Sequence, residues 1–169
     1  MNEYYLKKLL IEKEELIRKL EEYKGKEQIS VQEPDKEEIK GHIQKAEHNI
    51  KFVEDTSKKA FSDWVLVGCY YTLYHTALAL ILQKGYASKN HDATLCLLIK
   101  EYYKQISNDE IELINFTFLT KEDFFFYAES KNKREEASYS TKTIFEDINK
   151  IIIKTRLFLN KTKEMIETD

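Results

Sequence analysis

The chain is poor in the residues that turn a polypeptide back on itself. Four glycines and one proline stand among 169 residues. Tight hairpins depend on glycine or asparagine at positive φ, so this shortage argues against a fold built from β-hairpins. Apolar residues make up 42% of the chain, which is enough for one hydrophobic core. The composition therefore predicts an all-α protein of one domain with an extension.

The sequence also lacks the common motifs of catalytic and ligand sites. Its glycines are isolated, so no glycine-rich phosphate loop is present. No cluster of cysteine and histidine has metal-ligand spacing, and no nucleophile elbow occurs. We therefore predict no metal and no cofactor. The formal net charge of -3 gives no overall basicity of the kind that indicates nucleic-acid binding.

Cysteine is equally scarce. Cys69 and Cys96 both lie in apolar segments, where cysteine usually packs as a small core residue. Two such thiols predict a reducing compartment and a cytoplasmic protein rather than a disulfide framework.

What the chain does have is one long apolar segment. Residues 64–83 contain no charged side chain, although charged residues make up 34% of the protein. A helix that is apolar on every face belongs in the centre of a bundle or in a membrane. Tyr70, Tyr74 and His75 place polar atoms near its middle, where a bilayer would leave them without partners. We therefore predict a buried bundle helix and no membrane contact.

Two amphipathic segments precede this helix. Leucines in a heptad-like pattern predict one helix over residues 2 to about 24, packed on the bundle or on a partner's arm. Residues 25–34 interrupt the pattern. A second helix is expected to begin at Asp35, whose spacing to Glu38 matches a capping box, and to end near residues 56–59. The predicted units are an amino-terminal arm with its linker, residues 1–34, and a bundle, residues 35–169.

The ends of the central helix and of its successor are marked by capping residues. The fourth helix is expected to reach about residue 106. The expected end residues are Ser62 or Asp63 at the start of the central helix, Gly85 as its left-handed stop, and Ser88 or Asn90 before the fourth helix.

Two further helices complete the predicted bundle. Ser107 and Glu110 have capping-box spacing and predict a fifth helix that extends to about residue 128. The polar stretch 129–140 is expected to be a joint. Ser140 or Thr141 would then cap the last helix, with Ile144 on its core side. No sheet is expected.

The aromatic run Phe124–Tyr127 is richer than one helix face needs. Its phenylalanines either fold into the core or pack on a second subunit. Together with the seam of the arm, this surplus predicts a homodimer.

Few residues remain as candidates for chemistry. His75 lies mid-helix and can be a hydrogen-bonded core histidine or a functional group. His42 lies among charges and is expected on the surface. His91 opens the fourth helix, and Arg134 and Tyr139 fall in the polar joint. The cations between residues 150 and 163 do not share one helix face, which favours a solvated surface over a phosphate site.

The order of these motifs resembles the HEPN domain. Asp63-Trp64 is followed by the aromatic run CYYTLYHTALAL at residues 69–80, then by Lys84-Gly85 and Asn90-His91. The hexapeptide REEASY at residues 134–139 resembles the arginine-centred joint that precedes the last helix in that family. The resemblance covers about residues 40–160.

This resemblance implies an up-and-down helical bundle that commonly dimerises. Many HEPN proteins are metal-independent ribonucleases, and several are toxins paired with a minimal nucleotidyltransferase antitoxin. Their catalytic pattern is arginine, four to six residues, then histidine, at the dimer cleft. Arg134 matches the arginine, but Tyr139, Ser140 and Thr141 stand where histidine is expected. A tyrosine with a pKa of about 10 accepts protons poorly at neutral pH, so binding is favoured over catalysis.

Three functions remain open on the sequence. The first is a HEPN-like protein that binds RNA, a nucleotide or a nucleotidyltransferase partner without nuclease chemistry. The second is an active ribonuclease toxin with His75 or His91 as substitute base, and the third is a dimerising scaffold. The candidate site residues are Arg134 and Tyr139 for catalysis, at a cleft near the start of the last helix, and Tyr71, His75, His91 and Lys133 for binding.

Overall fold

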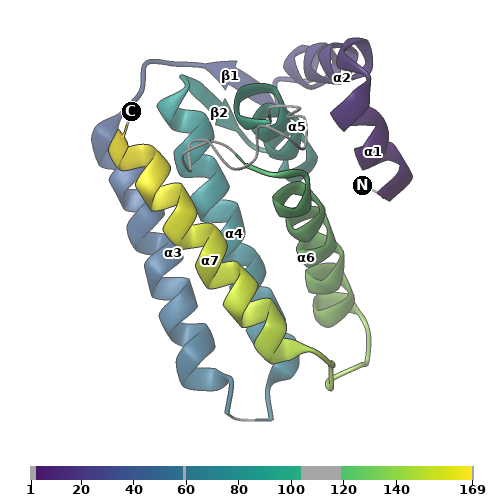
Figure 1. Cartoon of the computed structure of the whole chain (residues 1–169), viewed down its shortest axis with the longest axis vertical. Helices are drawn as coiled ribbons and strands as arrows, with labels where there is room; N and C mark the ends of the chain where they lie inside the picture. The colour runs from purple at the N-terminus through teal and green to yellow at the C-terminus, as the bar shows by residue number, and fades with distance from the viewer. Residues whose placement is uncertain (1–2, 59, 104–118, 169) are drawn as a thin grey trace, which may run out of the picture.

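The computed structural model describes residues 3–58, 60–103 and 119–168, which form an all-α bundle with one small sheet (Figure 1). The prediction of an all-α bundle is confirmed. The elements in chain order are α1 (Glu3–Ile11), α2 (Lys13–Gly25), β1 (Ile29–Val31), α3 (Lys36–Thr56), α4 (Ser62–Gln83), β2 (Tyr86–Ser88), α5 (His91–Tyr102), α6 (Lys121–Tyr139) and α7 (Ile148–Thr168).

Helix α4 is the centre of the bundle, as the uncharged segment predicted. It packs against α3, α5, α6 and α7. Within the described ranges α4 alone is long and apolar enough to cross a membrane, and most of it is buried inside the bundle. Its closest neighbour is α3, because Gly68 lets the two backbones approach. A Cβ at Gly68 would lie 2.6 Å from Val53 Cγ2.

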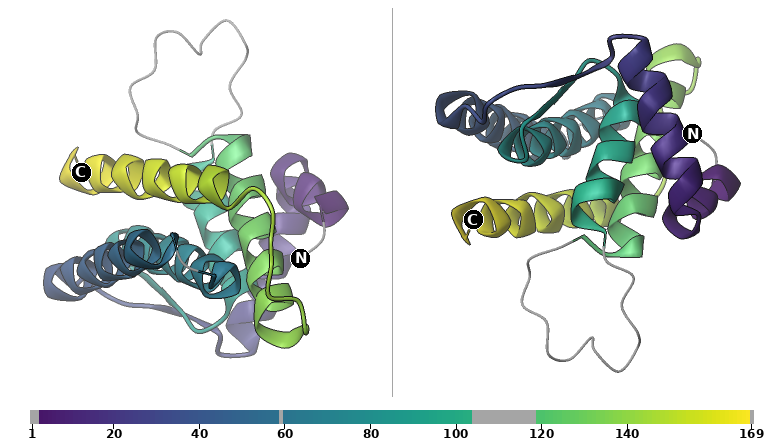
Figure 2. Two further views of the ribbon diagram at one scale, coloured as in Figure 1. Left: turned by 90° about the horizontal axis from the view of Figure 1, so that it is seen from below. Right: turned by 90° about the horizontal axis from the view of Figure 1, so that it is seen from above.

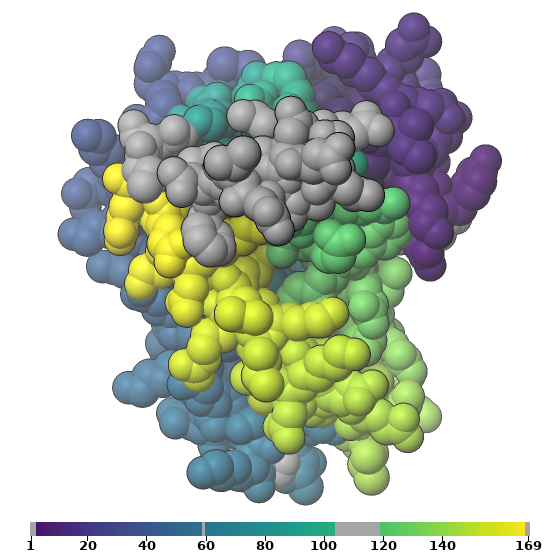
Figure 3. Space-filling view, viewed as in Figure 1, coloured from purple at the N-terminus to yellow at the C-terminus, as the bar shows by residue number. Residues whose placement is uncertain are grey.

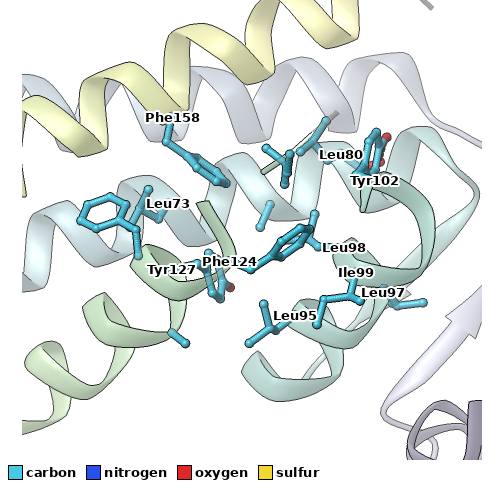
Figure 4. Packing of buried hydrophobic residues seen from close by; sticks show 14 of the residues in the cluster. Leu73, Leu80, Leu95, Leu97, Leu98, Ile99, Tyr102, Phe124, Tyr127 and Phe158 are labelled. Carbon is cyan, nitrogen blue, oxygen red and sulfur yellow. Dashed lines mark hydrogen bonds between the residues drawn. The ribbon is translucent and has the colours of Figure 1, made fainter. Parts of the chain in front are cut away.

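The core is formed where α4, α5, α6 and α7 converge (Figure 4). Phe124 and Tyr127 of α6 and Phe158 of α7 are almost fully buried there. Phe126 is also buried, and the half-buried Phe125 packs against the same cluster. The aromatic run is thus absorbed by the core of its own chain, which removes it as an argument for a homodimer.

The arm consists of two helices, so the prediction of one continuous helix was wrong. Glu12 has an extended backbone, with φ -98° and ψ 94°, and separates α1 from α2 (Figure 2). The bend lets both halves bury their leucines, Leu6 and Leu9 in α1 and Leu16 and Leu20 in α2. α1 packs on α5 and α6 and α2 packs on α5, which confirms that the arm lies on the bundle.

The linker after the arm pairs with the loop after α4. β1 and β2 form an antiparallel pair in which Ile29 faces Ser88 and Val31 faces Tyr86. Gln32 N donates to Gly85 O at 3.0 Å and extends the ladder. The expectation of no sheet was therefore wrong. Hydrophobic periodicity could not indicate this ladder, because it joins two short segments far apart in the sequence.

Most of the predicted helix ends are confirmed. The Asp35 side chain accepts from the backbone N–H of Glu37 and Glu38, Asn90 caps α5 in the same way, and Gly85 has φ +78°. The start of α4 differs, because Phe61 occupies the N-cap position without a side-chain cap. Ser62 Oγ instead donates to Thr143 O and accepts from Phe145 N, which ties α4 to the segment before α7.

The predicted joint at residues 129–140 was also wrong. The expected start of the fifth helix lies outside the described residues. α6 begins at a capping box of Thr120 and Asp123 and continues to Tyr139. α7 begins only at Ile148, and the expected core residue Ile144 is 79% exposed. The polar stretch continues α6, and its residues Ser130 and Arg134 are buried against the core.

Candidate functional site

The candidate site lies where Arg134 of α6 meets Tyr70 of α4 and His91 of α5. Tyr127, Lys131 and Arg134 recur at helical spacing, so one face of α6 carries all three toward α4 and α5. The guanidinium carbon of Arg134 lies 5.1 Å from the centre of the Tyr70 ring. We call Arg134, Tyr70 and His91 the arginine cluster.

Arg134 is buried without an acidic partner. Only 9% of its surface is exposed, and no carboxylate among the described residues forms an ion pair with it. Its Nε–H has no hydrogen-bond acceptor in the same part of the chain. A cation over an aromatic ring is stabilised by about 0.5–2 kcal/mol, whereas a buried donor without a partner costs about 1–3 kcal/mol. The guanidinium thus keeps one unpaired donor and has no carboxylate to neutralise it among the described residues.

Tyr70 and His91 form a short hydrogen bond beside this cation. Tyr70 Oη and His91 Nδ1 are 2.6 Å apart. Burial raises the pKa of Tyr70 above its ordinary value, so the phenol keeps its proton. Burial, followed by the charges of Arg134 and Lys131, lowers the pKa of His91. Both groups are therefore neutral, and the tautomer of His91 decides which of them donates.

Charged side chains of α5 and α6 border the cluster. Lys131 Nζ lies 2.8 Å from Asp92 Oδ1, next to His91 in the chain. The Tyr74 ring lies against His91 at a tilt of 51°, with 4.2 Å between the ring centres. The cluster thus joins an aromatic wall, a neutral imidazole and a buried cation, which is an arrangement suited to a phosphate with an attached base or sugar.

The other sequence-predicted site residues lie apart from Arg134. Tyr139 is 82% exposed at the end of α6. Lys133 pairs with Glu129 at 3.2 Å. Tyr71 is partly exposed on α4 and contacts the edge of Tyr70. Of the predicted residues, the structure thus brings together Arg134 and His91.

His75 has a separate partner. Its Nδ1 lies 3.0 Å from Nδ1 of His42, which is therefore not the surface histidine that the sequence predicted. Burial, followed by the neighbouring His42 and Lys45, lowers the pKa of His75 to about 4. His75 has the polar partner that we expected, but it is half-buried rather than a fully buried core histidine. No three His, Cys, Asp or Glu side chains gather as metal ligands in the described part of the chain.

Sequence reasoning missed Tyr70, Tyr74 and Lys131 as members of the site. The aromatic run contained a usable indication, because Tyr70 and Tyr74 are four residues apart and share a helix face. Lys131 and Arg134 could not be placed on a helix face opposite these tyrosines, because the polar stretch 129–140 predicts a joint rather than a helix.

Comparison with known proteins finds a relative of this chain. The chain is 28% identical over 133 residues to a Methanocaldococcus jannaschii protein named "Putative toxin MJ0142". The match covers 78% of this chain and 83% of that protein. No protein-family model matches the chain. The chain is thus similar over most of its length to a protein that carries a toxin name.

Proposed function

We propose that this chain is a toxin-like protein of HEPN type that binds the phosphates of RNA or of a nucleotide at the arginine cluster. The toxin name of the archaeal relative supports the first part, because the two proteins match over most of their lengths. The order of the motifs in residues 63–91 and the all-α bundle support the HEPN assignment.

The observation that carries the binding proposal is the buried Arg134 without a carboxylate. Helical proteins usually leave arginine at the surface or pair it with an acid. Here Nε points to no acceptor in the described residues, although the planar guanidinium fork fits phosphate oxygens. A phosphate would supply the missing negative charge and the missing acceptor together.

Binding is favoured over cleavage because one ring nitrogen of His91 is already engaged. A base that activates the 2′-hydroxyl needs a free lone pair, and Nδ1 of His91 is hydrogen-bonded to Tyr70 Oη. Tyr139, at the position of the family histidine, lies exposed and away from Arg134.

A ribonuclease is the second candidate, and one observation favours it. His91 is the histidine that lies beside Arg134, and its lowered pKa leaves the imidazole neutral near pH 7. RNA that displaced the Tyr70 hydroxyl would free Nδ1 to accept a proton. Cleavage would then depend on His91, whereas His75 faces His42.

The proposal includes a cytoplasmic homodimer and a nucleotidyltransferase antitoxin as partner. Helix α4 leaves Trp64 58% exposed and Tyr71 38% exposed, although most of the helix is buried. Aromatic surface of this kind favours a protein contact. A second copy on this face would lie next to the Tyr70 side of the arginine cluster.

Short oligoribonucleotides and total RNA test this function. We expect the unmodified protein to bind RNA without cutting it, and Arg134→Gln to weaken binding at least about tenfold. The matched control is Arg156→Gln, since Arg156 is an exposed arginine that pairs with Glu54 on α3. Equal loss in both variants would contradict a site at Arg134. RNA cleavage that is lost in His91→Ala would establish the ribonuclease instead.

A further inference from the structure

Helix α7 ends beside the start of α3 (Figure 1). A cavity of about 600 Å³ opens at this end of the bundle. Its walls come from α3, from Gln83 at the end of α4 and from α7. It shares no lining residue with the arginine cluster. The apolar side chains are Ile39, Ile43 and Ile166 with Pro34, and the charged ones are Lys36, Lys40, Lys163 and Glu167.

Charge at the cavity is mainly positive. Lys163 is paired with Glu47, but Lys36 and Lys40 have no carboxylate partner among the described residues. Both are exposed and stand one turn apart on α3, on the same side as Ile39 and Ile43. An occupant would therefore meet an apolar floor bordered by two free ammonium groups.

We propose that this cavity binds a peptide segment of a partner protein in which apolar residues alternate with acidic ones. Such a segment meets both features at once. Its apolar side chains fill the isoleucine floor, and two of its carboxylates approach Lys36 and Lys40. A free fatty acid matches the floor but brings only one carboxylate to the two lysines.

The probe is a fluorescent acetylated peptide of sequence LELELE, titrated with the full chain and followed by anisotropy. Its control is the LKLKLK peptide, which keeps the apolar residues and reverses the charge. We expect LELELE to bind and LKLKLK not to bind, with affinity that falls as salt rises. Binding of both peptides with equal affinity would overturn the proposal.

Variants place the peptide in the cavity. Lys40→Glu should weaken LELELE binding at least about fivefold, whereas Lys51→Glu, an exposed lysine of α3 outside the cavity, should leave it unchanged. Equal effects of the two lysine variants, or binding of dodecanoate but not of LELELE, would overturn the proposal. Arg134→Gln should bind LELELE normally, which separates this result from the RNA site.

Discussion

Replacement of Arg134 by methionine should separate stability from binding. Methionine keeps the length and most of the volume of the arginine side chain, but it carries no charge and no donor. The change removes the unpartnered Nε–H, which costs about 1–3 kcal/mol, and forfeits the contact with the Tyr70 ring, which contributes about 0.5–2 kcal/mol. We therefore expect the free energy of unfolding to stay equal or to rise by about 1 kcal/mol.

Urea denaturation followed by circular dichroism measures this change. For a chain of this size, 1 kcal/mol corresponds to a rise in melting temperature of about 2–4 °C. Binding of RNA should fall in the same variant, because methionine offers a phosphate neither a positive charge nor a hydrogen-bond donor. A loss of more than about 2 kcal/mol in Arg134→Met would refute the reasoning, since Arg134 would then hold the bundle together. The control Arg156→Met should change stability by less than about 1 kcal/mol.

Three further predictions concern packing, pH and assembly. Gly68→Ala should destabilise the protein by about 1–3 kcal/mol in urea denaturation, because the added methyl group would meet the buried Val53. The control Gly41→Ala has open space around the added methyl group and should stabilise the protein by about 0.5–1 kcal/mol. Equal effects of the two variants would contradict the close approach of α3 and α4. Because the pKa of His75 is lowered in the folded protein, the unfolded chain takes up a proton at this residue first as pH falls. The free energy of unfolding should therefore decrease by about 1 kcal/mol, after solvent screening, between pH of about 6.5 and about 4. His75→Asn should remove this part of the pH dependence of thermal unfolding, and an unchanged profile would contradict the shift. Light scattering at micromolar concentration should give a dimer that Trp64→Lys converts to a monomer, and a monomeric unmodified protein would contradict the contact at α4.

The bundle could be predicted because its helices carry local evidence. The uncharged segment 64–83 indicated α4, and Asp35, Gly85 and Asn90 marked helix ends by their own side chains or backbone freedom. The bend at Glu12 could not be predicted, because it depends on how the arm meets α5 and α6. Figure 3 shows α7 across the front of the molecule, and its start at Ile148 lies later than the cap at Ser140 or Thr141 that the sequence predicts.

The site was predicted only in part, and the reason is the misplaced joint. Arg134 and His91 are candidates by their positions in the sequence and also match the family resemblance, and the structure brings them together through Tyr70. Lys131 was overlooked because residues 129–140 are too polar to show an apolar stripe, although they continue α6. Tyr139 was named for its sequence spacing, and spacing alone does not place two residues five apart on one helix face.

The most direct test of the central claim observes the Arg134 Nε–H itself. In a ¹⁵N-labelled protein this group gives a resonance that can be assigned by its loss in Arg134→Met. Titration with a short oligoribonucleotide should move the resonance downfield and slow its exchange with water, because a phosphate oxygen becomes its acceptor. Binding of RNA that leaves this resonance unchanged and shifts only exposed lysines would contradict a phosphate site at Arg134.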